Sequence, residues 1–105
     1  MKVIKTTDKY TFYQDGNDYI LALGEIKKGD DTTTGLLFEK VEDVKGATVR
    51  ALCGCTIVEK NIISENSFSI QVKYTQCDPT YSKVVIINEG KPNGFKIRIK
   101  GSCKI

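Results

Sequence analysis

The residues best suited to chemistry in this chain of 105 residues are two thiols one residue apart, in the run Cys53-Gly54-Cys55-Thr56. The run lies between two segments patterned like β-strands, at 47–53 and 56–59, and the chain contains no histidine. Cysteine thiolates serve proteins as nucleophiles, as redox pairs and as zinc ligands. Each of these uses requires further groups at defined positions.

The rest of the chain supplies few of those groups. A cysteine nucleophile needs a neighbouring base, most often histidine, and a zinc site usually combines two C-x₂₋₄-C pairs. The Cys53–Cys55 spacing is shorter than that, so only all four cysteines, with Cys77 and Cys103, could complete a zinc shell. We therefore predict no catalytic residue, no metal and no cofactor, and interpret Gly54 as a bulge or tight turn. A thiol redox or metal-binding protein that uses Cys53 and Cys55 stays open as an alternative.

The number of cysteines does not decide whether they form disulfides, because four cysteines allow three full pairings. Free thiols are the default in a reducing compartment. We therefore expect structural thiols, with one disulfide formed after cell lysis as the alternative. A bond between Cys53 and Cys55 is disfavoured, because their side chains would share one face of an extended strand with Cα atoms close to the ~7 Å limit.

Charge and composition exclude several other functions. The acidic pair Asp30-Asp31 lies in a turn without further acidic ligands, which favours a solvated turn over a calcium site. The net charge is only +3, and Arg50 and Arg98 are the only arginines among 16 basic residues. Because arginine is the residue suited to forked phosphate and base-edge contacts, sequence-specific nucleic-acid binding is disfavoured.

Alternation of apolar and polar residues dominates the second half of the chain. Residues 67–74 alternate with Phe68, Ile70, Val72 and Tyr74 on one face, and residues 95–100 do the same. One dry and one wet face is typical of antiparallel sheets. The segment 83–87 is apolar on both faces, so we expect a central strand that is covered on two sides.

Shorter strands and recurrent turns are expected in the first half. Segments 10–14 and 19–23 flank Asp15-Gly16-Asn17-Asp18, a plausible hairpin turn. Further strands are predicted at 33–41, 47–53 and 56–59. A chain of this length forms one domain. We predict a single all-β domain over 1–105, an immunoglobulin-like antiparallel β-sandwich of seven to eight strands, in which residues 1–9 form an N-terminal arm or a peripheral strand.

Tyrosines provide the candidate contact residues. Tyr10, Tyr13 and Tyr19 cluster with Phe12 in the first hairpin. Tyrosine is favoured at protein interfaces, where one side of the ring is apolar and the other is wet. The competing interpretation is that Phe12 and Tyr19 fill the core of the sandwich. If the hairpin is an exposed edge, it could pair with a strand of a neighbouring chain.

The segments around the two thiols resemble the DUF1573 family, immunoglobulin-like domains related to the ASH modules. The run Cys53-Gly54-Cys55-Thr56 resembles the CGCT signature of that family, and the other matching segments follow in the family's order. These segments are 23–29, 34–39, 70–74, 83–86 and 95–101, and the span from 23 to 101 that contains them is about three quarters of the chain. The resemblance implies an immunoglobulin-like binding domain, usually exported. Cys77 and Cys103 lie outside the family pattern.

The N-terminal residues and the hydropathy indicate where such a domain works. Residues 1–8 lack the apolar segment of a signal peptide, and no window approaches the ~18 apolar residues of a membrane span. An unexported domain of this kind suits a tailed-phage particle assembled in the host cytoplasm, and the richness in Lys, Ile, Asn and Tyr suits crAss-like phages. We expect a non-enzymatic virion protein, an auxiliary capsid or decoration protein that binds other subunits and no membrane. The alternative is a DUF1573-type binding module of the bacterial periplasm or envelope, or an intracellular one.

Overall fold

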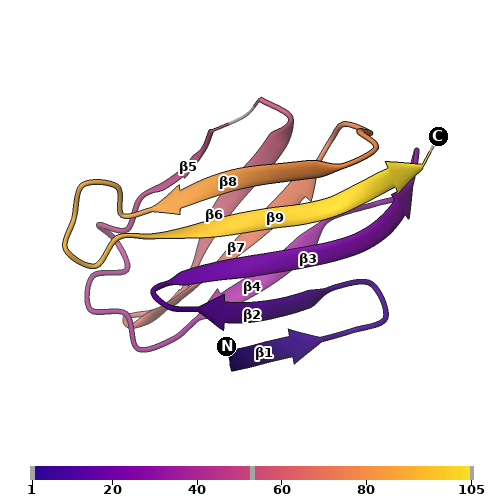
Figure 1. Ribbon diagram of the computed structural model, residues 1–105. Coiled ribbons are helices and arrows are strands. Elements are labelled where there is room, and N and C mark those ends of the chain that lie inside the picture. Colours follow the sequence, from indigo (N-terminus) through magenta and orange to yellow (C-terminus); the bar gives the residue numbers. More distant parts are fainter. Residues whose placement is uncertain (1, 53, 105) are drawn as a thin grey trace.

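The fold consists of β-strands throughout the part of the chain that the structure describes. The computed structural model describes residues 2–52 and 54–104, which form nine strands and no helix (Figure 1). No helix in these residues is long and apolar enough to cross a membrane. The strands are β1 (Lys2–Thr6), β2 (Thr11–Asp15), β3 (Asp18–Lys27), β4 (Thr34–Phe38), β5 (Val49–Ala51), β6 (Thr56–Ser64), β7 (Ser67–Tyr74), β8 (Tyr81–Ile87) and β9 (Phe95–Lys104).

Two sheets of unequal width form the sandwich. The wide sheet has the order β1-β2-β3-β9-β8-β5, and the narrow sheet has the order β4-β7-β6 (Figure 1). The predicted class, an all-β sandwich, is confirmed. Strands β4-β7-β6 and β9-β8-β5 correspond to the B-E-D and G-F-C groups of an immunoglobulin-like domain.

The first strand of that core departs from the constant-type arrangement and from the antiparallel pattern. Strand β3 lies in the wide sheet, where it pairs in parallel with β9, from Tyr19 opposite Ile97 to Lys27 opposite Lys104. A β-bulge shifts the register between Ala22 and Gly24, and the φ of 68° at Gly24 suits glycine because it has no Cβ. The hairpin β1-β2 adds two strands to this immunoglobulin-like set of seven, so the total of nine exceeds the predicted seven to eight.

Alternating residues build the core as predicted. The inward residues of β7, from Phe68 to Tyr74, are all buried, and Ile97 and Ile99 of β9 are fully buried. The turn at Gly16 and Asn17 joins β2 to β3 as expected, with Asp15 opposite Asp18. Five aromatic rings fill one end of the core at centroid distances of 5.1–6.2 Å, namely Phe12, Tyr19, Phe38, Phe68 and Phe95.

Several predicted strands differ from those in the structure, where the strand expected at 33–41 covers 34–38 and the one expected at 19–23 covers 18–27. The strand expected at 47–53 is only three residues long, whereas the one expected at 56–59 continues to Ser64 because β6 pairs with β7 along its whole length. Strand β8 lies inside the wide sheet as predicted, but the expectation that both of its faces are covered is wrong. Val84 and Ile86 are only half-buried, because no second layer packs on the outer face of this sheet.

The expectation of free thiols is wrong for Cys77 and Cys103. These two residues form a disulfide with a Cα–Cα distance of 5.1 Å, although 26 residues separate them. The Cys103 N–H also donates to the carbonyl of Asp78, at 2.8 Å. Sequence spacing does not reveal this pair, because β8 and β9 form a hairpin that brings the end of the chain back to the segment after β7.

Two stacked tyrosines close the other end of the core. The rings of Tyr74 and Tyr81 lie 4.1 Å apart at 20°, and the Tyr74 hydroxyl donates to the carboxylate of Asp78. The hydroxyl of Tyr81 is buried and has no hydrogen-bond partner among the described residues. Burial raises the pKa of Tyr81 to about 12. The pKa of Tyr74 is also raised, first by burial and then by its bond to Asp78.

We expect Tyr81→Phe to raise the free energy of unfolding by about 1 kcal/mol at neutral pH, because it removes a buried hydroxyl that lacks a partner. The variant also changes the alkaline limb of the stability curve. Ionised Tyr81 is favoured in the unfolded chain, where its pKa is near 10, so wild-type stability falls as pH rises from 10 towards 12. The fall should be shallower in the variant. Urea unfolding across this pH range measures both effects, and a less stable variant at pH 7 would contradict the argument.

Candidate interaction surface

Strand β1 is the most exposed element of the fold. The wide sheet has six strands and the narrow sheet three, so β1 extends past the sandwich at one edge (Figure 1). All five of its residues are exposed, including Val3 at 58% and Ile4 at 45%. Strand β1 pairs with β2 on one side, and no described strand pairs with its other side. Its outer backbone groups are therefore open to pairing.

The sequence of β1 limits indiscriminate pairing. Lys2 and Lys5 carry charge along the edge, and the register with β2 shifts between Val3 and Lys5. Charged residues and bulges are the usual protection of an open edge against aggregation. A partner strand must therefore match this interrupted register, which favours a specific contact.

The four predicted contact residues separate into two groups. Phe12 is 3% exposed and stacks on Tyr19 at 5.4 Å, and both rings contact Phe38 in the core. Tyr10 is half-buried and also packs against the core. Tyr13 is half-buried and pairs with Val3 and with Ile20, on the opposite face of the sheet from Phe12. Tyr13 is therefore the member of the group that lies on the outer face, beside β1.

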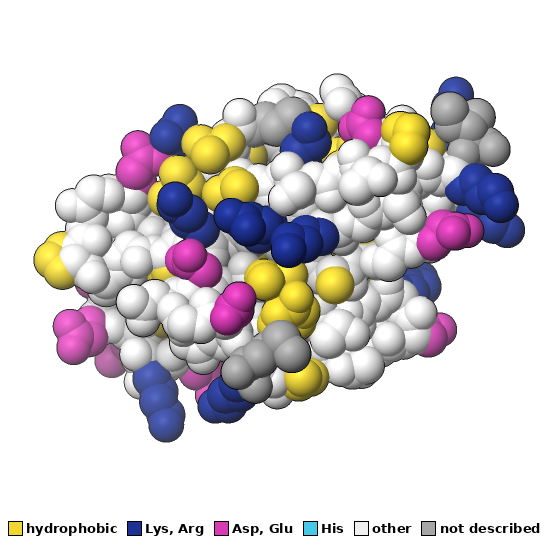
Figure 2. Space-filling view, viewed as in Figure 1, with side chains coloured by type: hydrophobic (Ala, Val, Ile, Leu, Met, Phe, Trp, Pro, Cys, Tyr) yellow, Lys and Arg dark blue, Asp and Glu magenta, His cyan; other side chains and the backbone are white. Residues whose placement is uncertain are grey.

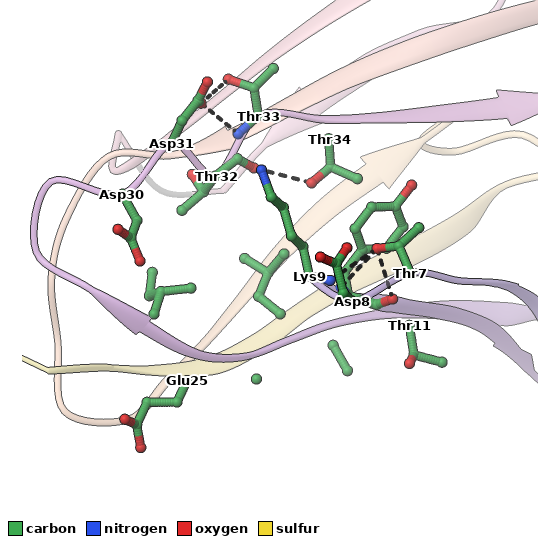
Figure 3. A pocket seen from close by; sticks show the side chains of 15 residues that line it. Thr7, Asp8, Lys9, Thr11, Glu25, Asp30, Asp31, Thr32, Thr33 and Thr34 are labelled. Carbon is green, nitrogen blue, oxygen red and sulfur yellow. Dashed lines mark hydrogen bonds between the residues drawn. The ribbon is translucent and has the colours of Figure 1, made fainter.

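A cavity of about 610 Å³ lies between the β1–β2 turn and the β3–β4 loop, and residues 22–26 of β3 line it as well. Figure 3 shows that hydroxyl and carboxylate side chains from both segments surround it and that Lys9 extends from the turn towards the loop. Its polar lining is formed by Thr7, Asp8, Lys9, Thr11, Glu25, Asp30, Asp31, Thr32, Thr33 and Thr34.

The carboxylates at this cavity stabilise their own loop. Asp30 accepts the backbone N–H of Lys27 at 2.8 Å, and Asp31 accepts the hydroxyl and the N–H of Thr33 at 2.6 and 2.9 Å. These bonds to Thr33 hold the pKa of Asp31 below its ordinary value, and the charges of Lys73 and Lys9 act in the same direction. Such bonds hold the β3–β4 loop as a firm rim of the cavity.

The CGCT segment connects the two sheets. Gly54 and Cys55 form a turn between β5 of the wide sheet and β6 of the narrow sheet. Cys55 is 1% exposed, and its carbonyl accepts both the N–H and the hydroxyl of Thr75, at 2.7 and 2.8 Å. Thr56, which begins β6, is also buried. Cys53 lies outside the described residues, so the prediction that a Cys53–Cys55 bond is disfavoured also falls outside them.

The described cysteines are not free thiols. In the disulfide, Cys77 and Cys103 are not available as thiolate ligands. Within residues 2–52 and 54–104, no group of three or more His, Cys, Asp or Glu side chains is arranged to hold a metal ion. The turn at Cys55 joins the sheets, and the two bonds from Thr75 to the Cys55 carbonyl fix it to the end of β7.

The fold and its exposed edge define this protein as an all-β sandwich with an added N-terminal hairpin. Comparison with known proteins gives no match to a family model, to a curated protein or to a solved structure.

Proposed function

We propose that this protein is a non-enzymatic interaction module that binds neighbouring protein subunits through β1. The observation that carries the proposal is the fully exposed edge strand, with Val3 and Ile4 presented to solvent beside an open backbone edge. A strand of a partner chain that adds to this edge gains main-chain hydrogen bonds, and contacts with alternate side chains provide specificity. Tyr13 pairs with Val3 on the neighbouring strand and would contact such a partner.

The assembly that we propose is a phage virion, in which this protein is an auxiliary capsid or decoration component. Support comes from the CGCT resemblance to immunoglobulin-like binding domains and from a compact fold in which the edge strand β1 is exposed along its whole length. Many equivalent sites on a shell allow weak contacts per copy to add up. Co-purification of the protein with intact particles tests this assignment, and its absence from washed particles would contradict it.

Deletion of residues 1–6 is expected to abolish co-sedimentation with particles purified without this protein. The same deletion should change the free energy of unfolding by less than about 1 kcal/mol, because no β1 side chain belongs to the core. Sedimentation of the bound fraction and urea unfolding measure the two effects.

A matched control separates the backbone of β1 from its side chains. Val3→Thr with Ile4→Thr retains β-branched residues and the full strand, so we expect it to keep most of the binding that the deletion loses. Undiminished binding by the deletion variant would show that β1 is not the attachment strand.

The disulfide favours a second candidate, a DUF1573-type module of the bacterial periplasm or envelope. Disulfides persist in oxidising environments such as the periplasm and virion surfaces, and are rare in a reducing cytosol. The Cys77–Cys103 pair therefore supports a place of action outside the cytosol in either case. Fractionation of the producing cells, with alkylation of free thiols before lysis, distinguishes an envelope protein from a particle component.

A further inference from the structure

A row of basic side chains lies along the outer face of β9. Phe95, Ile97 and Ile99 point to the core, so Lys96, Arg98 and Lys100 point to the outer face of the wide sheet, and all three are exposed. Figure 2 shows dark blue side chains across the middle of this face, over β9, with hydrophobic side chains on both sides of them. These three residues are the polar positions of the alternation predicted for 95–100, where only the apolar positions were assigned a role.

Apolar residues border the basic row on both neighbouring strands. Arg98 pairs with Ile20 of β3 on one side and with Val84 of β8 on the other. Lys96 pairs with Ile86, and Lys100 pairs with Ala22. These four apolar residues are buried or half-buried beside the basic side chains. The face therefore combines cations with aliphatic surface.

None of the three cations of the row forms an ion pair with the rest of the described chain. Within that part of the protein, the structure shows an ion pair only between Arg50 and Glu89, at 2.5 Å. One carboxylate, that of Asp18, lies at the Lys96 end of the row and accepts the backbone N–H of Lys96 at 3.0 Å, so the row keeps an excess of positive charge. Successive cations of the row are about 7 Å apart, because residues i and i+2 of a strand share a face.

We propose that this face binds an acidic, extended segment of a partner protein. Carboxylates at every second residue of such a segment would match the spacing of Lys96, Arg98 and Lys100, and its intervening apolar residues would contact Val84 and Ile86. Charge complementarity of this kind increases the association rate and the specificity. A protein partner fits better than a nucleic acid, because bound bases need aromatic stacking platforms, and Tyr13 is the only described aromatic residue placed on this face.

The basic face is separate from the edge at β1, so the two proposals can fail independently. The probes are short fluorescent peptides with glutamate at every second position and either valine or serine between, and an oligothymidylate of equal charge. Fluorescence anisotropy at low and moderate salt measures each Kd. We expect the glutamate–valine peptide to bind most tightly, more weakly at higher salt, and equally well to the variant that lacks residues 1–6.

Reversal of the row tests the assignment. We expect the combined variant Lys96→Glu, Arg98→Glu, Lys100→Glu to raise the Kd of the glutamate–valine peptide at least about tenfold. The matched control Lys28→Glu, Lys45→Glu, Lys73→Glu makes the same change of charge at exposed positions away from this face, and should raise it less than about threefold. Thermal unfolding confirms that both variants are folded.

Three results would overturn the proposal. An equal loss in both variants would mean that only the net charge matters. Tighter binding of the oligothymidylate would identify a polyanion surface that does not select a protein. Self-association of the wild type that the row reversal abolishes, measured by sedimentation velocity, would identify a second copy of this chain as the occupant.

Discussion

Replacement of Gly101 by alanine is expected to lower the free energy of unfolding by about 3 kcal/mol. A Cβ at this position would lie 2.6 Å from the Tyr81 hydroxyl and 2.8 Å from the carbonyl oxygen of Gly24. Neither atom can move easily. Tyr81 is 4% exposed and stacked on Tyr74, and Gly24 belongs to the parallel partner strand opposite Gly101. Urea unfolding of the variant measures the loss.

A second background identifies the cause of this loss. In Tyr81→Phe the hydroxyl that the new Cβ would meet is gone, so Gly101→Ala should cost at least about 1 kcal/mol less there than in the wild type. Part of the cost should remain, because the Gly24 carbonyl is unchanged. If Gly101→Ala costs the same in both backgrounds, the contact with Tyr81 is not the source. Gly35→Ala is a matched control, since a Cβ at Gly35 would meet no atom within 4 Å.

Loss of the Cys77–Cys103 disulfide is expected to lower the free energy of unfolding by about 3 kcal/mol. The bond closes a loop across 26 residues, and loop closure restricts the unfolded chain by an amount that grows with loop length. The segment it restrains, after β7, also carries Asp78, the partner of the Tyr74 hydroxyl. The variant Cys77→Ser with Cys103→Ser and the wild type are compared by urea unfolding without reductant.

Reduction provides the control for this prediction. A reductant should lower the stability of the wild type by more than that of the double variant, because only the wild type has the Cys77–Cys103 bond to lose. If the two proteins unfold at the same urea concentration without reductant, the bond does not contribute as expected. A variant that loses stability while its m-value also changes would indicate an altered unfolded state, which the loop-closure argument anticipates.

The sandwich was predictable because the period of side chains is a local property. In the segments 67–74 and 95–100, the alternation of apolar and polar residues indicates which face of the strand is buried. Phe68, Ile70, Ile97 and Ile99 are buried as this alternation predicts. The turn at Gly16 was predictable for a similar reason, because glycine marks turns that need a positive φ, here 65°. Strand β6 was underestimated because its residues 60–63 do not alternate, and its pairing with β7 determines its length.

Only some residues of the candidate surfaces could be predicted from the sequence. The hairpin was found from its tyrosines and its turn, but sequence could not assign Phe12 and Tyr19 to the core and Tyr13 to the outer face. That assignment depends on which sheet face the narrow sheet covers. The alternation of 95–100 predicts that Lys96, Arg98 and Lys100 share one face. Only the structure shows that this face belongs to a strand between β3 and β8, where no other described strand covers it.

Sequence alone therefore determined the class of fold, its strand-forming segments and the tight hairpin, since these depend on neighbours a few residues apart. Tertiary structure alone decided the parallel pairing of β3 with β9, the meeting of Cys77 with Cys103 and the overhang of β1. These features depend on which distant segments become neighbours and which faces stay uncovered. Such choices minimise the free energy of the whole chain, and no single segment encodes them.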